Sequence, residues 1–161
     1  MLPPFQRLLD DHGVAVYRFL LASVGAHDAP DCYQDTLVSA LKAYPSLPHG
    51  DNLKGWLFTI AHHKAIDAHR ARARNPVPVA KVHERADRPP PPPPAAAGDH
   101  WERVRALPAR QREVLTLRYA ADLTHGEIAT VLHCTEEAAR RAAADGLKNL
   151  RKELTDVAAT A

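Results

Sequence analysis

Apolar side chains recur every three or four residues along the front of the chain, a spacing that is typical of helices packed on one face. A first helix is predicted there, with Gly13 as a candidate break. Its apolar face comprises Phe5, Leu8, Leu9, Val16, Leu20 and Val24. A second helix is expected from about Asp28 to about Tyr44, because aspartate caps helix starts and Pro30 fits a first turn. Its inward stripe would be Tyr33, Leu37, Ala40, Leu41 and Tyr44.

A third predicted helix has an apolar beginning and a basic end. The preceding segment 45–51, Pro-Ser-Leu-Pro-His-Gly-Asp, cannot continue a helix and is expected to be a loop. Helical spacing returns from Asn52 to about Arg72. The apolar positions of this helix are Trp56, Leu57, Ile60, Ala61 and Ile66.

Cap and turn residues in the last third of the chain predict a helix-turn-helix. Two helices are expected first, from Asp99 with Trp101, Val104 and Leu107, and from Pro108 with Val114, Leu115 and Tyr119. Thr124-His-Gly-Glu127 is a capping box, in which the hydroxyl and the carboxylate satisfy backbone amides at a helix start. That helix would end near Leu132, and after the turn His133-Cys134 a last helix, capped by Thr135, would reach about Leu154. The second helix of such a motif can lie in the major groove of DNA.

A proline-rich segment separates the two helical regions. Eight of the fourteen prolines fall in residues 75–99, six of them consecutive. Proline lacks an amide donor and fixes φ, so this segment is expected to be a semi-rigid polyproline II spacer rather than helix or strand. A ligand for an aromatic groove is the alternative use of such a run. The prediction is an all-α protein with modules at 1–74 and 100–161, joined by the linker 75–99.

Composition and charge narrow the class of protein. Of 161 residues 45% are hydrophobic, which excludes wholesale disorder, and no apolar run is long enough for a membrane span. The first residues do not have the pattern of a secretory signal, so a cytoplasmic location is expected. Residues 1–53 carry three basic against six acidic side chains, whereas residues 54–74 carry five basic against one acidic. An acidic segment followed by a basic one suggests two different partners.

Three stretches, taken together, resemble the bacterial RNA polymerase sigma factors of the extracytoplasmic-function (ECF) type. Residues 28–37, DAPDCYQDTL, are similar to the family's acidic helix, which docks on the polymerase β′ clamp. Residues 55–70, with GWLFTIA, AID and Arg70, are similar to its helix that opens and reads the minus-ten promoter element. Residues 107–129, with LPARQREVL, LRY and EIA, resemble region four, which reads the minus-thirty-five element. The resemblance covers about residues 5–74 and 100–154, in family order.

Carried over residue by residue, this resemblance implies three binding sites and no enzymatic activity or cofactor. The polymerase-binding residues would be Asp28, Asp31, Gln34, Asp35 and Leu37. The minus-ten DNA-binding residues would be Asn52, Lys54, Trp56, His62, His63, Arg70, Arg72 and Arg74. The minus-thirty-five DNA-binding residues would be Thr124, Thr135, Ala138, Arg140, Arg141 and Lys148. The implied partners are core RNA polymerase (β′ clamp and β flap), double-stranded and melted promoter DNA, and an anti-sigma factor.

The residue types fit these roles. Acidic side chains can meet a basic groove on the polymerase, and arginines supply the phosphate contacts that DNA binding needs. Arg70 and Arg74 are four apart and share a helix face, while Arg72 points elsewhere. Trp56 could stack on unstacked bases or belong to the core. Two departures stand out: His63 replaces the family's usual Asn, and the last helix has acids at Glu136 and Glu137 where the usual family pattern is more basic.

Other readings of the chain remain open at this level. His62, His63 and His69 form the tightest histidine group, but neighbours on a helix diverge by about 100° and do not converge on one metal. Cys32 and Cys134, in separate modules, are more simply buried side chains than a redox pair. Two further alternatives are a helix-turn-helix operator-binding regulator, and a degenerate sigma-like protein that binds polymerase or an anti-sigma factor without initiating transcription.

Overall fold

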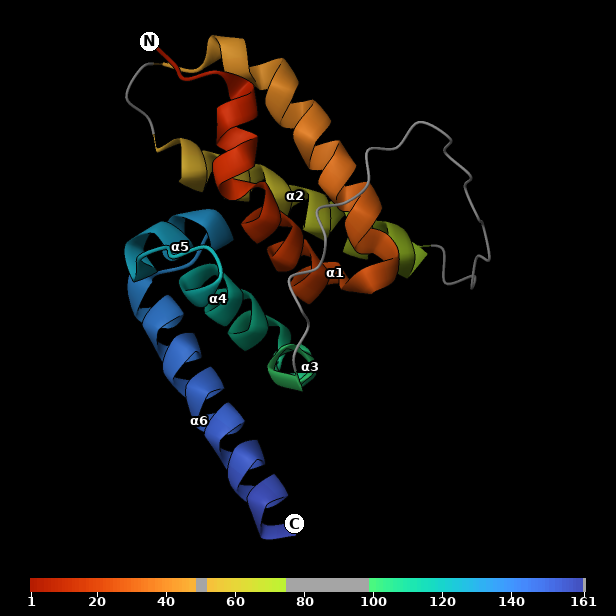
Figure 1. The fold of residues 1–161 in the computed structure, drawn as a ribbon, viewed down its shortest axis with the longest axis vertical. Coiled ribbons are helices and arrows are strands. Elements are labelled where there is room, and N and C mark those ends of the chain that lie inside the picture. Colours follow the sequence, from red (N-terminus) through yellow and green to blue (C-terminus); the bar gives the residue numbers. More distant parts are fainter. Residues whose placement is uncertain (49–51, 75–98, 161) are drawn as a thin grey trace.

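The computed structural model describes residues 1–48, 52–74 and 99–160, and every regular element in these ranges is a helix. Figure 1 shows their arrangement. The first module contains α1 (Phe5–Ala43), the short 3₁₀ helix η1 (Tyr44–Ser46) and α2 (Leu53–Arg74). The second contains α3 (Asp99–Ala106), α4 (Ala109–Tyr119), α5 (His125–Leu132) and α6 (Glu136–Thr160). The predicted linker lies, except for Asp99, outside the described residues.

The long helix α1 is a hairpin of two arms that meet at Gly25. Gly25 has φ 84° and ψ 171°, a conformation that is essentially restricted to glycine, and the chain reverses there (Figure 1). The rings of Tyr17 and Tyr33 meet edge to face, with centroids 5.4 Å apart, and join the first arm (5–24) to the second (26–43). The predicted break at Gly13 is wrong: Gly13 is buried inside the first arm, where a Cβ atom would lie only 2.9 Å from the Tyr33 hydroxyl.

The inward face of the second arm also differs from the prediction. Ala40 and Tyr44 are buried as expected, but Leu41 is 56% exposed, and Tyr33 and Leu37 are only half-buried. The remaining inward positions are Ala29, Cys32 and Thr36. These side chains are small, so the second arm can pack closely on its neighbours, and the larger apolar residues lie to the side.

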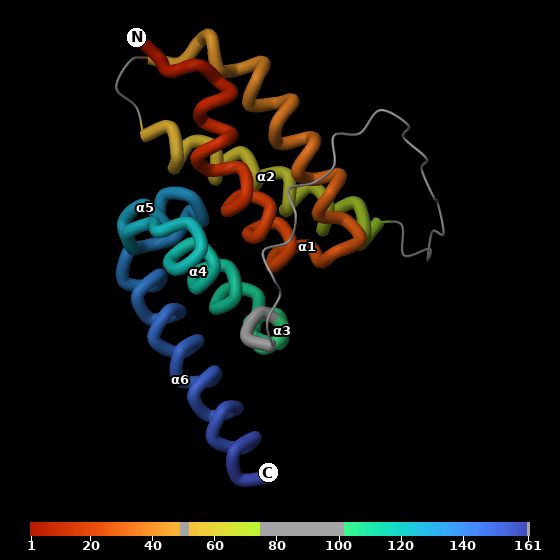
Figure 2. Tube along the Cα trace, viewed as in Figure 1, coloured from red at the N-terminus to blue at the C-terminus, as the bar shows by residue number. Residues whose placement is uncertain are grey.

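The predicted helix starts are confirmed where a side chain caps the helix. The Asn52 side-chain oxygen accepts a hydrogen bond from the Gly55 amide (3.0 Å) at the start of α2. The Thr124–Glu127 capping box is complete, and the Thr135 hydroxyl accepts from the Ala138 amide (3.1 Å) before α6. α6 continues to Thr160, beyond the predicted end, and its last part extends past the other helices (Figure 2).

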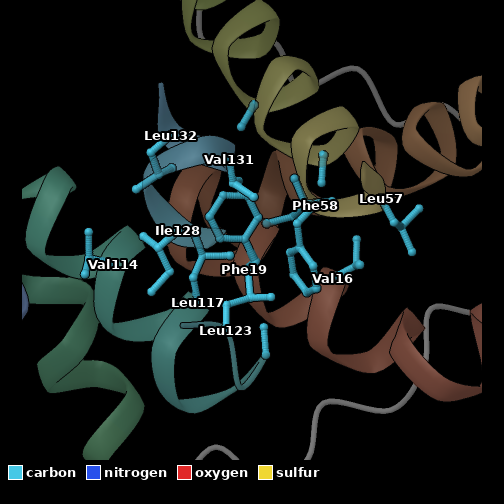
Figure 3. Packing of buried hydrophobic residues seen from close by; sticks show 14 of the residues in the cluster. Val16, Phe19, Leu57, Phe58, Val114, Leu117, Leu123, Ile128, Val131 and Leu132 are labelled. Atoms are coloured by element: carbon cyan, nitrogen blue, oxygen red, sulfur yellow. The ribbon is translucent and has the colours of Figure 1, made fainter. Parts of the chain in front are cut away.

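The two modules pack against each other and share one hydrophobic core. α4 lies against α1, and α5 lies against α2. Figure 3 shows Phe19 and Phe58 of the first module together with Ile128 and Val131 of the second, and all four are fully buried. The Phe19 and Phe58 rings meet edge to face with centroids 6.0 Å apart. The helix-turn-helix therefore covers one side of α2.

Substitution of Gly25 by alanine is expected to destabilise the protein by about 1–3 kcal/mol, because an alanine would be held in a glycine-only backbone conformation. No atom lies within 4 Å of the position that the new Cβ would take, so the cost is conformational and not steric. Urea unfolding would measure it. The control is Gly126→Ala in α5, where the nearest atom to a Cβ is a Glu136 carboxylate oxygen at 3.7 Å and φ is not positive. Equal effects of the two substitutions would contradict this account.

Candidate functional site

The second arm of α1 presents a mixed acidic and apolar face to solvent. Asp31 and Asp35 are exposed, and Val38 and Leu41 are 45% and 56% exposed. Gln34 and Leu37, expected to share this face, are half-buried. Sequence reasoning missed the exposure of Val38 and Leu41, since it assigned Leu41 to the core. Exposed apolar side chains beside carboxylates are suited to a protein partner with a basic, partly apolar groove.

Asp28, the first acid of this arm, is paired within the molecule. Its carboxylate lies 3.2 Å from the guanidinium of Arg72, which is in the last turn of α2. Arg72 therefore points toward the acidic arm. Arg74 Nε donates to the Arg70 backbone carbonyl (3.4 Å), so these two basic residues lie together on an exposed helix end. The structure thus places Arg70 and Arg74 apart from Arg72, as their spacing predicts.

The beginning of α2 faces the second module. Asn52 Nδ2 donates to a Glu127 carboxylate oxygen (2.7 Å), and Lys54 Nζ donates to the Asp122 backbone carbonyl (3.2 Å). At the end of the first turn of the helix, Trp56 is half-buried and its ring centroid lies 6.2 Å from that of Tyr44. This packing favours the core interpretation of Trp56 over an exposed stacking surface.

The two neighbouring histidines of α2 differ in their surroundings. His62 is 6% exposed, with its ring 6.4 Å from Phe19, and its Nδ1 has no hydrogen-bond partner. His63 is exposed, and its Nε2 lies 2.9 Å from Nε2 of His133, with the two rings within 9° of parallel. Of the two, only His63 could reach DNA without the modules moving apart far enough to uncover the core.

Burial lowers the pKa of His62 to about 4, and the neighbouring His63 and His133 add to the effect. In the unfolded chain His62 takes up a proton near pH 6.5, whereas in the folded chain it does so only near pH 4. The free energy of unfolding is therefore unaffected by His62 well above pH 6.5 and decreases as the pH falls from 6.5 toward 4. We expect the wild type to lose on the order of 1–2 kcal/mol more than His62→Leu between pH 7 and pH 4.5. Urea unfolding at several pH values would measure this, with exposed His27→Asn as the control. Parallel pH profiles for wild type and His62→Leu would contradict the assignment.

The helix α6 exposes the residues expected to contact the minus-thirty-five element. Thr135, Ala138, Arg140, Arg141 and Lys148 are all exposed. Arg140 is paired with Glu136, and Arg141 lies 3.4 Å from Glu137. The hydroxyl of Thr124 is used by the capping box, where it accepts from the Glu127 amide (3.2 Å). The acids at the start of α6 thus neutralise the two arginines nearest to them.

The other kinds of site considered from the sequence find little support in the described residues. Within them, no three His, Cys, Asp or Glu side chains are arranged to hold a metal ion. Cys32 and Cys134 are both free, and burial, with help from Asp28 and Asp35, raises the pKa of Cys32 to about 11. Such a thiol stays protonated and is a poor nucleophile. None of the described helices has the length and apolar character needed to cross a membrane.

Two family models match the chain, one for each module. The Sigma-70 region 2 model matches residues 8–75, and the Sigma-70 region 4 model matches residues 104–152. The ECF RNA polymerase sigma factor ShbA of Streptomyces griseus is 33% identical over 135 residues, which are 78% of this chain and 71% of ShbA. The ECF RNA polymerase sigma factor SigD of Mycobacterium tuberculosis is 32% identical over 151 residues, 86% of this chain and 71% of SigD.

Solved structures with the same fold cover nearly the whole chain. The sigma factor RpoE of Bartonella quintana, solved in complex with the anti-sigma factor NepR, superposes with a TM-score of 0.76 and 26% identity over 96% of this chain and 98% of RpoE. CnrH, solved in complex with the cytosolic domain of CnrY, gives a TM-score of 0.66 at 22% identity, over 94% of this chain and 88% of CnrH. The likeness to CnrH concerns the fold alone.

Proposed function

The chain belongs to the ECF RNA polymerase sigma factors, a family of DNA-binding transcription factors that are not enzymes, and from this membership we propose that it binds core RNA polymerase and directs initiation at specific promoters. The observation that carries the proposal is the exposed face of the second arm of α1. There Asp31 and Asp35 lie beside Val38 and Leu41, and all four residues are exposed. In this role the face docks on the β′ clamp, and the protein works in the cytoplasm, where polymerase and promoters are.

The promoter-binding roles fall on the helices α2 and α6. The exposed arginines Arg70 and Arg74 bind phosphates near the minus-ten element, and Asn52, Lys54 and His63 supply hydrogen-bonding groups for melted bases. Binding of a captured single strand stabilises the open promoter over the duplex, which shifts the opening equilibrium without any chemical step. The exposed residues of α6, together with contacts to the β flap, position the protein on the minus-thirty-five element.

An anti-sigma factor is a further expected partner. The support for it is the likeness to RpoE, which was solved with the anti-sigma factor NepR and resembles this chain over almost its full length. We expect such a protein to bind this chain in a similar compact arrangement.

One observation favours a second candidate, a sigma-like protein that binds polymerase without initiating. Arg140 and Arg141 are each engaged by a glutamate one turn earlier in α6. Acidic side chains there repel DNA phosphates, which weakens recognition of the minus-thirty-five element. An operator-binding regulator has no comparable support, because it leaves the acidic arm and α2 without a role.

Reconstitution with core polymerase tests the proposal. The purified chain is expected to give transcripts with specific start sites across genomic template DNA, where core polymerase alone gives none. Truncation after residue 98 separates the contribution of the second module: unchanged start sites would remove the minus-thirty-five role of Arg140 and Arg141. Binding to polymerase without specific starts would favour the non-initiating candidate, and absence of binding would overturn both.

A further inference from the structure

Three polar contacts join α2 to the second module, and three of the residues proposed to read the minus-ten element make them. They pair Asn52 with Glu127 (2.7 Å), Lys54 with the Asp122 carbonyl (3.2 Å) and His63 with His133 (2.9 Å). These contacts, here called the latch, span 68 to 75 positions of sequence. A side chain that is hydrogen-bonded across the modules is not available to a DNA base.

The latch sits on an apolar contact that fixes how the modules meet. Phe58 and Ala61 of α2 are fully buried, as are Ile128 and Val131 of α5, and Figure 3 shows Phe58 beside Val131. Burial of the apolar side chains favours association of the modules, and its free energy does not change with pH. The free energy of the polar contacts around it changes with pH where a group titrates. The pH dependence of closure therefore depends on the titratable part of the latch.

Each neutral imidazole ring carries one N–H. The contact between His63 and His133 can be kept when one more proton is added, but not when two are. A hydrogen bond between two ring nitrogens needs one N–H and one lone pair, so two neutral rings or one imidazolium with one neutral ring satisfy it. When both rings are protonated, two N–H groups and two positive charges face each other at 2.9 Å. The contact between His63 and His133 must then break.

The charged groups around the pair are mostly basic. The pair lies beside buried His62, and His69 and Arg110 act electrostatically on that same His62 ring. Of the acids on that side, exposed Asp67 lies one turn after His63 on α2. Burial raises the pKa of Glu113 in α4, on which Arg110, Arg112 and His69 already act. On the α5 side Glu127 is engaged by Asn52 and by the Thr124 amide.

We infer that the second module gates the promoter-binding face of α2, and that double protonation of His63 and His133 releases this gate. The masking of promoter-reading residues rests on the proposed function, but the opening on acidification does not. Asp35, Val38 and Leu41 stay exposed while the latch is closed. The closed chain can therefore dock on polymerase before its minus-ten residues become accessible.

Energy transfer between dyes on the two modules tests the gate in the full chain, without polymerase or DNA. Lys42→Cys and Thr155→Cys are both at exposed positions, with Cys134→Ser added and buried Cys32 left in place. Two protonated rings would face each other as cations across the closed contact, so we expect the open-to-closed ratio to rise about tenfold or more between pH 8 and pH 5.5. The matched variant is His133→Asn, because asparagine tolerates the left-handed backbone of this residue (φ 54°) and does not titrate.

His133→Asn is expected to remain closed across this pH range, and His63→Asn, on the other side of the pair, should behave in the same way. His27→Asn, at an exposed position next to the reversal of α1, should open as the wild type does. A wild type that stays closed at pH 5.5, or asparagine variants that open with it, would overturn the inference. A second measurement adds core polymerase and a pre-melted promoter. If the modules open on acidification but the protein with polymerase does not bind the promoter, the inferred gate is supported and the proposed function is refuted.

Discussion

Reversal of Asp31 and Asp35 to lysine is expected to abolish co-purification of the protein with core RNA polymerase. Both side chains lie on the exposed face of the second arm, beside Val38 and Leu41. Charge complementarity across an interface steers association, and like charges placed opposite each other cost several kcal/mol. The double reversal should therefore weaken binding by at least about a hundredfold, which corresponds to about 2.7 kcal/mol. Pull-down and titration with labelled polymerase would measure it.

The matched control is the double reversal Asp10→Lys with Asp11→Lys, on the first arm. These acids are also exposed and adjacent on α1, where they contact Gln6 and Arg7 at the surface. The change in net charge is the same in both variants, so a difference between them isolates the docking face from a general electrostatic effect. Polymerase binding that survives the reversal of Asp31 and Asp35 would refute the docking assignment.

Removal of the two aligned arginines, Arg70→Ala with Arg74→Ala, is expected to impair promoter opening strongly and to flatten its salt dependence. Both are exposed at the end of α2 and lie together through the contact of Arg74 with the Arg70 carbonyl. Each phosphate contact that is lost removes about one unit from the slope of log K against log salt, so two contacts should remove about two units. At moderate salt the yield of open complex should fall about tenfold or more.

Arg72→Ala is the comparison variant for this test. Arg72 lies between the other two in sequence, but its guanidinium is paired with Asp28 at 3.2 Å. Its loss should leave the salt slope closer to the wild-type value than loss of Arg70 or Arg74. Open-complex yield on a supercoiled promoter, measured from low to high salt, distinguishes these cases. Equal slopes for the double variant and the wild type would remove the phosphate-binding role.

Local sequence signals predicted the helix starts well. The features that they did not predict depend on tertiary packing. The capping box at Thr124 and the cap at Asn52 depend on residues within one turn, which periodicity and residue type reveal. The break in α1 was different, because Gly13 and Gly25 look alike in sequence. Their roles depend on contacts: Gly13 allows the Tyr33 hydroxyl to approach, and Gly25 supplies the positive φ of the reversal.

The predicted binding residues were assigned from family motifs, and their surroundings could not be predicted in the same way. Periodicity does not distinguish two adjacent faces of a helix that has apolar residues on both, so Leu41 was expected inside and is exposed. The pairing of Asn52 with Glu127 joins residues 75 positions apart across the linker. Nothing local to either residue indicates this contact, because it depends on how two separately capped modules meet.

The groups that the second module offers to α2 are already fixed by that module's own backbone. Asp122 and His133 both have left-handed φ angles (55° and 54°), set by the turns before and after α5. Glu127 is oriented by the Thr124 amide, which donates to its second carboxylate oxygen (2.8 Å). Closure therefore immobilises few torsions on this side and costs little conformational entropy. The modules should meet as rigid bodies, in a fast and reversible step that requires no local refolding.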